Sequence, residues 1–161
     1  MSHTFTFDDY PKSKDDLIKL PEINLDSPFK TAALTVLVLL NYKDNVDKTI
    51  EMLNVLKGPQ ALSNQEISFL KDRIKEKWYV VPSFFEGSNP ENDYKYNLPL
   101  KITIHEDKYT YNQKGYAKLL IQSSGADSKR PIVLREKDNK WYLWENMLLS
   151  DIRKPASLNV W

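Results

Sequence analysis

Few residues of this 161-residue chain could carry acid–base or nucleophilic chemistry. The chain has two histidines and no cysteine, which excludes thiolate catalysis, disulfides and cysteine-ligated zinc. His3 falls in a polar N-terminal segment, and His105 falls on the polar side of a predicted strand. A serine–histidine–aspartate triad would depend on His105, but no G-x-S-x-G elbow holds a serine for it. We therefore predict no catalytic residue and favour a protein that is not an enzyme.

Signals for bound metals, phosphates and sugars are equally sparse. There is no H-E-x-x-H motif, and the four glycines are too scattered to form a phosphate-binding loop. The acidic pairs Asp8-Asp9 and Asp15-Asp16 are adjacent in sequence, which is typical of solvated segments. A glycosidase instead needs two carboxylates about 5 to 10 Å apart across a cleft. The sequence thus predicts no metal and no cofactor.

The strongest signal for a binding surface is the segment DNKWYLWEN, from Asp138 to Asn146. In a strand, Trp141 and Leu143 point to one face, and Tyr142 and Trp144 to the other. Two interpretations stay open. Both faces are covered core, or one face lines a concavity and contacts a ligand. We favour the first, with Trp141 packed towards the helices and Trp144 under the long loop or the C-terminal tail.

The residues that would contact a ligand follow from this pattern and from a long aromatic loop. They are Arg135, Tyr142, Trp144, His105, Tyr94 and Tyr96. Arg135 is predicted within a largely apolar sheet, so we expect Glu145 on the adjoining strand to pair with it. The segment SSGADSKRP, from Ser123 to Pro131, forms either an anion-binding loop or a hairpin loop with local hydrogen bonds. We favour the hairpin loop.

Three successive helices are predicted before the strands. Ser27 and Pro28 are typical of a helix start, and the helix to Tyr42 is apolar on nearly every side, which indicates a central position. A second helix begins after Asp44 and ends at Gly58-Pro59, with Val46, Ile50, Leu53 and Leu56 facing inward. A third begins at Ser63 with a capping box, S-N-Q-E, and its inward face is Ile67, Leu70, Ile74 and Trp78.

Four strands are predicted after an irregular stretch from Pro82 to Pro99. They are LKITIHE, YAKLLIQS, PIVLREK and KWYLWEN, and Asp138-Asn139 forms a tight turn between the last two. The predicted fold class is therefore α+β, with three helices packed on a curved four- or five-stranded antiparallel sheet. We expect residues 1–26 to form a polar arm with a short helix near Lys14 to Leu20, and residues 27–161 to form one domain.

Composition limits the partners and the location. The chain has 23 basic and 22 acidic residues, so no net charge attracts nucleic acid or an anionic membrane. Its longest apolar run, Ala32 to Leu40, falls well short of the ~20 residues that span a bilayer. The N-terminus has no apolar region typical of a signal peptide. We expect a soluble cytoplasmic protein.

Several stretches of the chain resemble an uncharacterised bacterial family, a domain of unknown function. They are SPFKTAAL, LKGPQALS, FFEGSNPENDY and the segment from Ser123 to Ser157. Helices followed by a curved sheet are also similar in element order to the NTF2-like or cystatin-like cone. Two functions stay open. The first is a non-enzymatic binding module for a protein or peptide partner, or for self-association. The second is an NTF2-like small-molecule binder or enzyme with a pocket between sheet and helices.

Overall fold

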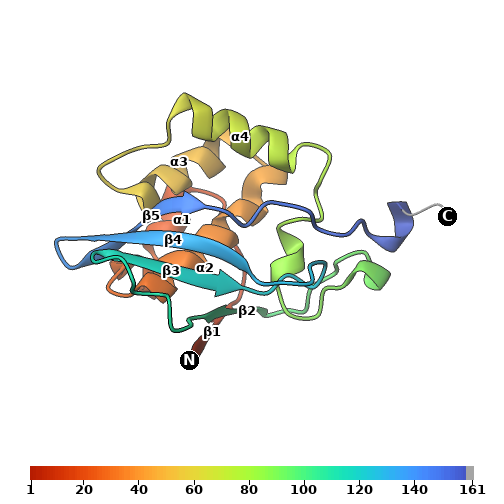
Figure 1. Cartoon of the computed structure of the whole chain (residues 1–161). Helices are drawn as coiled ribbons and strands as arrows, with labels where there is room; N and C mark the ends of the chain where they lie inside the picture. The colour runs from red at the N-terminus through yellow and green to blue at the C-terminus, as the bar shows by residue number, and fades with distance from the viewer. Residues whose placement is uncertain (159–161) are drawn as a thin grey trace.

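A five-stranded antiparallel sheet with helices packed on one side forms the body of the protein (Figure 1). The structure is a computed structural model that describes residues 1–158. Strands adjacent in sequence are adjacent in the sheet, in the order β1-β2-β3-β4-β5. This confirms the predicted α+β class. The elements are β1 (Ser2–Phe7), α1 (Lys14–Ile18), α2 (Pro28–Leu39), α3 (Val46–Lys57), α4 (Asn64–Ile74), β2 (Leu100–His105), β3 (Tyr116–Ile121), β4 (Arg130–Lys137) and β5 (Lys140–Asn146).

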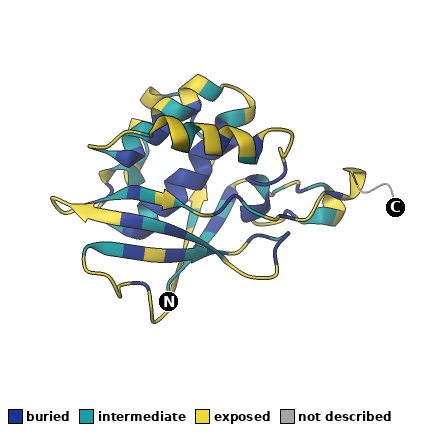
Figure 2. Ribbon diagram, turned by 45° about the horizontal axis from the view of Figure 1, so that its top comes forward, coloured by how far each residue is buried: buried dark blue, intermediate teal, exposed yellow. Residues whose placement is uncertain are grey.

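Helix α2 is the centre of the core. The Ser27 hydroxyl accepts a hydrogen bond from the Phe29 N–H at 3.2 Å, and Pro28 occupies the first turn, as the sequence predicts. Every residue from Thr31 to Leu40 is buried, and Figure 2 shows the helix as a continuous dark blue element. Leucines and isoleucines from the inner face of the sheet are also fully buried. Side chains therefore fill the space between α2 and the sheet.

Helices α3 and α4 follow the predicted pattern with one change of phase. The cap of α3 is Asn45, not Asp44, because the Asn45 side chain accepts from the Lys48 N–H. Its inward stripe is Thr49, Met52, Leu53 and Leu56, whereas Val46 and Ile50 are half-buried. The predicted stripe was thus wrong by part of a turn. Helix α4 begins at the predicted capping box and buries Leu70 and Ile74. The prediction was wrong for Ile67, which is half-buried, and for Trp78, which is exposed beyond the end of the helix.

The N-terminal segment contributes an element that the sequence did not indicate. Residues 2–7, within the expected polar arm, form β1 and pair with β2 from Ser2 opposite His105 to Phe7 opposite Leu100. Phe7 is buried, and it attaches this edge strand to the core. The short helix expected near Lys14 to Leu20 is present as α1, in which Leu17 is buried.

Strands β4 and β5 form a hairpin that contains the aromatic segment. Asp138 and Asn139 both have positive φ angles, 52° and 65°, as a tight two-residue turn requires. A register shift between Val133 and Leu134 follows, where the β5 strand gains one residue. Such a bulge changes the direction of a strand. Among the described residues, no helix is long and apolar enough to cross a membrane.

Candidate functional site

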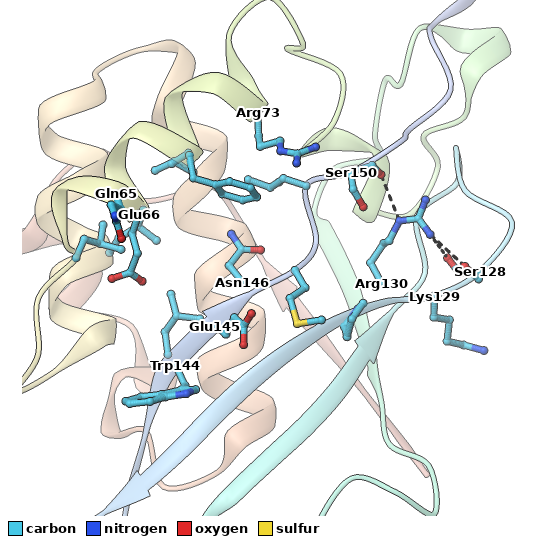
Figure 3. Close-up of a pocket in the computed structure, with 18 residues that line it drawn as sticks. Gln65, Glu66, Arg73, Ser128, Lys129, Arg130, Trp144, Glu145, Asn146 and Ser150 are labelled. Carbon is cyan, nitrogen blue, oxygen red and sulfur yellow. Dashed lines mark hydrogen bonds between the residues drawn. The ribbon is translucent and has the colours of Figure 1, made fainter.

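A groove lies between helix α4 and the segment formed by β5 and the residues after it. We call it the α4–β5 groove; its volume is about 740 Å³. Figure 3 shows side chains from both walls directed into it. The apolar residues that line it are Leu53, Leu62, Phe69, Leu70, Leu143, Met147 and Leu149, and the polar ones include Gln65, Glu66, Arg73, Lys129, Arg130, Glu145, Asn146 and Ser150.

Helix α4 leaves the groove open because it touches the body at few positions. Only Leu70 and Ile74 are buried along its length. Phe69, one residue before Leu70, is 46% exposed at the groove, and Met147 on the other wall is 39% exposed. Two large apolar side chains thus face solvent from opposite walls. Exposed apolar residues that gather in a concave surface are typical of binding sites.

A buried lysine holds the groove's inner end together. The Lys57 side chain is 5% exposed, and its Nζ lies 3.0 Å from Glu66 Oε2 and 3.3 Å from the backbone oxygen of Trp144. Glu66 Oε1 accepts the Ser63 N–H at 3.0 Å. Burial raises the pKa of Glu66, but the hydrogen bonds from Ser63 and Lys57 outweigh it and leave this pKa below its ordinary value. One lysine therefore connects α3, α4 and β5.

The outer edge of β5 is already hydrogen-bonded to the body. The Trp141 N–H donates to the Leu25 backbone oxygen at 2.8 Å, and the Thr31 hydroxyl donates to the Trp141 backbone oxygen at 2.7 Å. Lys57 occupies the Trp144 oxygen. These contacts occupy part of the edge that an added strand would use.

One end of the groove is basic. Figure 3 shows Arg73 and Arg130 on either side of Ser150, with the exposed Lys129 side chain pointing away from them and Glu66 and Trp144 towards the other end. The Nε atom of Arg73 is buried without a hydrogen-bond partner. The Arg130 guanidinium donates to backbone oxygens of Ser128, Ser150 and Asp151. Within residues 1–158, no carboxylate lies within salt-bridge distance of these three basic side chains.

A second, smaller depression lies beyond Trp144. Its volume is about 270 Å³, and it includes three of the predicted ligand residues, Arg135, Tyr142 and Trp144. The Arg135 guanidinium lies 4.8 Å from the Trp144 ring centroid, and Tyr116 meets the same indole edge-on at 5.8 Å. Both depressions include Trp144 in their walls. The structure thus brings half of the predicted residues together.

Two expectations about this aromatic segment were wrong. Arg135 does not pair with Glu145, because the two-residue turn at Asp138-Asn139 places Arg135 opposite Tyr142, whereas Glu145 lies opposite Val133 beyond the bulge. Trp144 packs with Arg135 and Tyr116, not under the long loop or the tail. The part of the expected cover that included Trp161 lies outside the described residues.

The other predicted ligand residues lie elsewhere. His105 is opposite Leu120 near the far end of β3, whereas Arg135 is opposite Tyr116 at its start, a separation of about 13 Å along the strand. Burial, Lys129 and the N-terminal amine lower the pKa of His105. The distance along the strand therefore keeps His105 from acting together with Arg135.

The aromatic residues of the long loop pack among themselves. Tyr94 is buried, stacks on Tyr79 at 5.9 Å, and donates its hydroxyl to the Arg153 backbone oxygen. Tyr96 is half-buried against Phe85, with ring centroids 5.8 Å apart. These contacts hold the loop against the core. They leave neither ring in the groove.

The segment from Ser123 to Pro131 contains a local hydrogen bond of the kind that the hairpin interpretation predicts. The Ser123 hydroxyl donates to the Ser83 hydroxyl at 2.7 Å and accepts the Gly125 N–H at 3.1 Å, so the serines make the internal hydrogen bonds we favoured. The basic pair that follows the serines is not buried in the protein interior. Lys129 and Arg130 line the groove.

Comparison with known proteins assigns the family. A family model described as a domain of unknown function, DUF6935, matches residues 9–156. The chain belongs to this family. No curated protein and no solved structure matches the chain, so the NTF2-like or cystatin-like relationship stays a prediction. Membership confirms the resemblance to an uncharacterised family.

The main wall of the groove was missed from the sequence. Phe69 and Arg73 are four residues apart and so lie on one side of α4, and a phenylalanine beside the buried stripe was the available signal. Met147 follows the last strand and has no periodic pattern around it. Within the described part of the chain, no group of three or more His, Asp or Glu residues could hold a metal ion.

Proposed function

We propose that this protein is a non-enzymatic binding module and that the α4–β5 groove holds a small, largely apolar ligand. The observation that carries the proposal is an open groove of about 740 Å³ with exposed Phe69 and Met147 on opposite walls. Pockets of roughly 300–1,000 Å³ with mainly apolar walls and a few polar groups are typical of small-molecule sites. This differs from an interior NTF2-like pocket, because α2 fills that space.

The groups in the groove favour binding over catalysis. Glu66 is the acidic side chain nearest the inner end, and both of its oxygens already accept hydrogen bonds. Its pKa lies below the ordinary value, which makes it a weak general base near neutral pH. His105 does not line the groove. A ligand would therefore meet a rigid apolar surface with few groups able to move a proton.

Fluorescence of a neutral apolar probe tests the proposal. N-phenyl-1-naphthylamine is expected to bind the protein with increased emission, and Phe69→Ser is expected to weaken this binding about tenfold, or ~1.4 kcal/mol. Ile18→Ser is the matched control, because Ile18 is also exposed but lies on α1, outside the groove. Equal binding by the two variants, or no binding by the wild type, would rule the groove out as the ligand site.

A protein partner is a second candidate for the same surface. Phe69 and Met147 are exposed in the groove, and Trp78, just after α4, is exposed outside its lining; tryptophan and methionine are enriched where proteins meet. Self-association through this face would appear in sedimentation velocity as a concentration-dependent dimer. Phe69→Ser would then abolish the dimer, whereas a wild-type chain that stays monomeric would reject self-association.

A further inference from the structure

We infer that the ligand of the α4–β5 groove is an amphipathic organic anion whose acidic group binds at Arg73. The inference rests on the proposed function and specifies the class of molecule that the groove accepts. The proposed ligand carries a carboxylate at one end of an apolar body. The arrangement of charge along the groove supports this proposal.

Charge in the groove is separated by position. Arg73 and Arg130 lie at the Ser150 end, Lys129 lines that end with its side chain pointing outward, and the acidic residues Glu66 and Glu145 lie further along the groove (Figure 3). Glu66 is neutralised by Lys57 at 3.0 Å. The basic end has no such compensation, since no carboxylate of residues 1–158 lies within salt-bridge distance of its three cations.

Arg73 is the residue that most needs a partner. Its Nε lies out of water without a hydrogen-bond partner among residues 1–158, and a buried donor without a partner is destabilising, more so when it is charged. Its guanidinium carbon lies 4.7 Å from the Phe69 ring centroid, and this contact restricts the orientation of the guanidinium. A planar guanidinium held in place suits two parallel hydrogen bonds to a carboxylate.

The neighbouring groups favour an anion over a neutral polar head. Arg130 is fixed by the backbone oxygens of Ser150 and Asp151, so its charge stays near the groove without being neutralised. Lys129 contributes a more distant, exposed charge at the same end, with its side chain directed away from Arg130. The apolar body would then extend from Arg73 along Phe69 and Met147. A strongly anionic or fully polar ligand would leave these apolar walls uncovered.

Competition between matched ligands tests the inference. Decanoate and decanol share an apolar chain and differ in the head group, and each would displace N-phenyl-1-naphthylamine from the wild-type protein. We expect decanoate to compete at least about tenfold more strongly. Raising NaCl from ~20 mM to ~500 mM should reduce that preference, because salt screens the exposed part of the interaction.

Variants of one helix locate the preference. Arg73→Met keeps a long side chain over Phe69 and is expected to make decanoate and decanol compete equally. Lys71→Met removes a charge from the same turn at an exposed position outside the groove, and it should keep the preference. If Arg73→Met fails to fold by circular dichroism, Arg73→Lys serves, and an intermediate preference is expected. In the wild type, decanoate but not decanol should shift the Arg73 Nε–H resonance.

The outcomes separate the two proposals. Probe binding without any preference for decanoate, or a preference that survives Arg73→Met, would overturn the anion inference and leave the binding function intact. Absence of probe binding would overturn the binding function and the inference with it. A tenfold preference lost only in the Arg73 variant supports both.

Discussion

Replacement of Glu66 by glutamine should loosen helix α4 and expose how the groove is held together. Glutamine retains an oxygen that can accept the Ser63 N–H, so the capping box survives. What is lost is the negative charge 3.0 Å from Lys57 Nζ. The Lys57 side chain is 5% exposed and would keep a buried charge with only the Trp144 backbone oxygen and a neutral amide beside it.

The magnitude follows from the burial of the two partners. Removing one member of a fully buried ion pair costs about 3–5 kcal/mol. Glu66 is 41% exposed, so water screens the pair and can reach the site after the change. We therefore expect Glu66→Gln to cost about 1–2 kcal/mol in the free energy of unfolding. Amide hydrogen exchange should rise first in α4, because only Leu70 and Ile74 are buried along it.

The pH dependence has a definite sign. The pKa of Glu66 is below its ordinary value of 4.5 in the folded protein, so its contribution is present above that pH and is lost as the pH falls through the folded pKa. The difference between wild type and Glu66→Gln, measured by urea unfolding, should therefore shrink below pH 4.5. It should be constant between neutral pH and mildly acidic pH.

A double-mutant cycle with Lys57→Met completes the test. Methionine fills a similar volume without a charge, so the double variant should be about 1 kcal/mol more stable than the sum of the single changes predicts. Additive losses, or an α4 whose exchange is unchanged in Glu66→Gln, would refute the role assigned to this pair.

Three further predictions address the core, a turn and the groove. Leu37→Ala should lower the free energy of unfolding in urea by about 2–5 kcal/mol, because Leu37 is fully buried. Lys48→Ala, on the exposed side of α3, should lower it by about 0.5 kcal/mol or less. Similar losses for the two variants would contradict this prediction. Gly58→Ala should lower the melting temperature, because Gly58 has φ of +71° and an added Cβ would lie 2.4 Å from the Tyr142 ring; an unchanged melt would show that Tyr142 moves freely. Trp144 emission, in a variant with the other indoles replaced, should change when the groove probe binds, and a constant spectrum would separate Trp144 from the site.

Local signals in the sequence were sufficient to predict most of the elements. Ser27-Pro28, Gly58-Pro59 and Asp138-Asn139 act within a few residues, and each begins or ends an element where expected. Strand β1 carries a weaker signal, because its formation depends on pairing with β2 about a hundred residues later. Its residues look like a polar arm until that partner is known.

The groove escaped sequence analysis for a related reason. Phe69 and Arg73 acquire their roles from the way α4 sits beside β5, and that placement depends on Lys57 reaching both Glu66 and Trp144. The bulge after Leu143 also shifts Glu145 and Asn146 by one position relative to β4. Such an extra residue cannot be predicted from the alternation of apolar and polar residues alone. The sequence therefore indicated which residue types could form a site, but not which side chains they would contact.

Helices α2 and α4 have opposite consequences for ligand binding. Helix α2 is apolar on all sides, so it fills the concave face and leaves no room there for a ligand. Helix α4 has a narrow buried stripe of Leu70 and Ile74, so it cannot close against β5 along its full length. The Phe69 side chain therefore stays partly exposed, next to Arg73, whose Nε has no hydrogen-bond partner among residues 1–158. A filled core and a lightly attached helix together place the groove, and with it the proposed binding site, at the edge of the sheet.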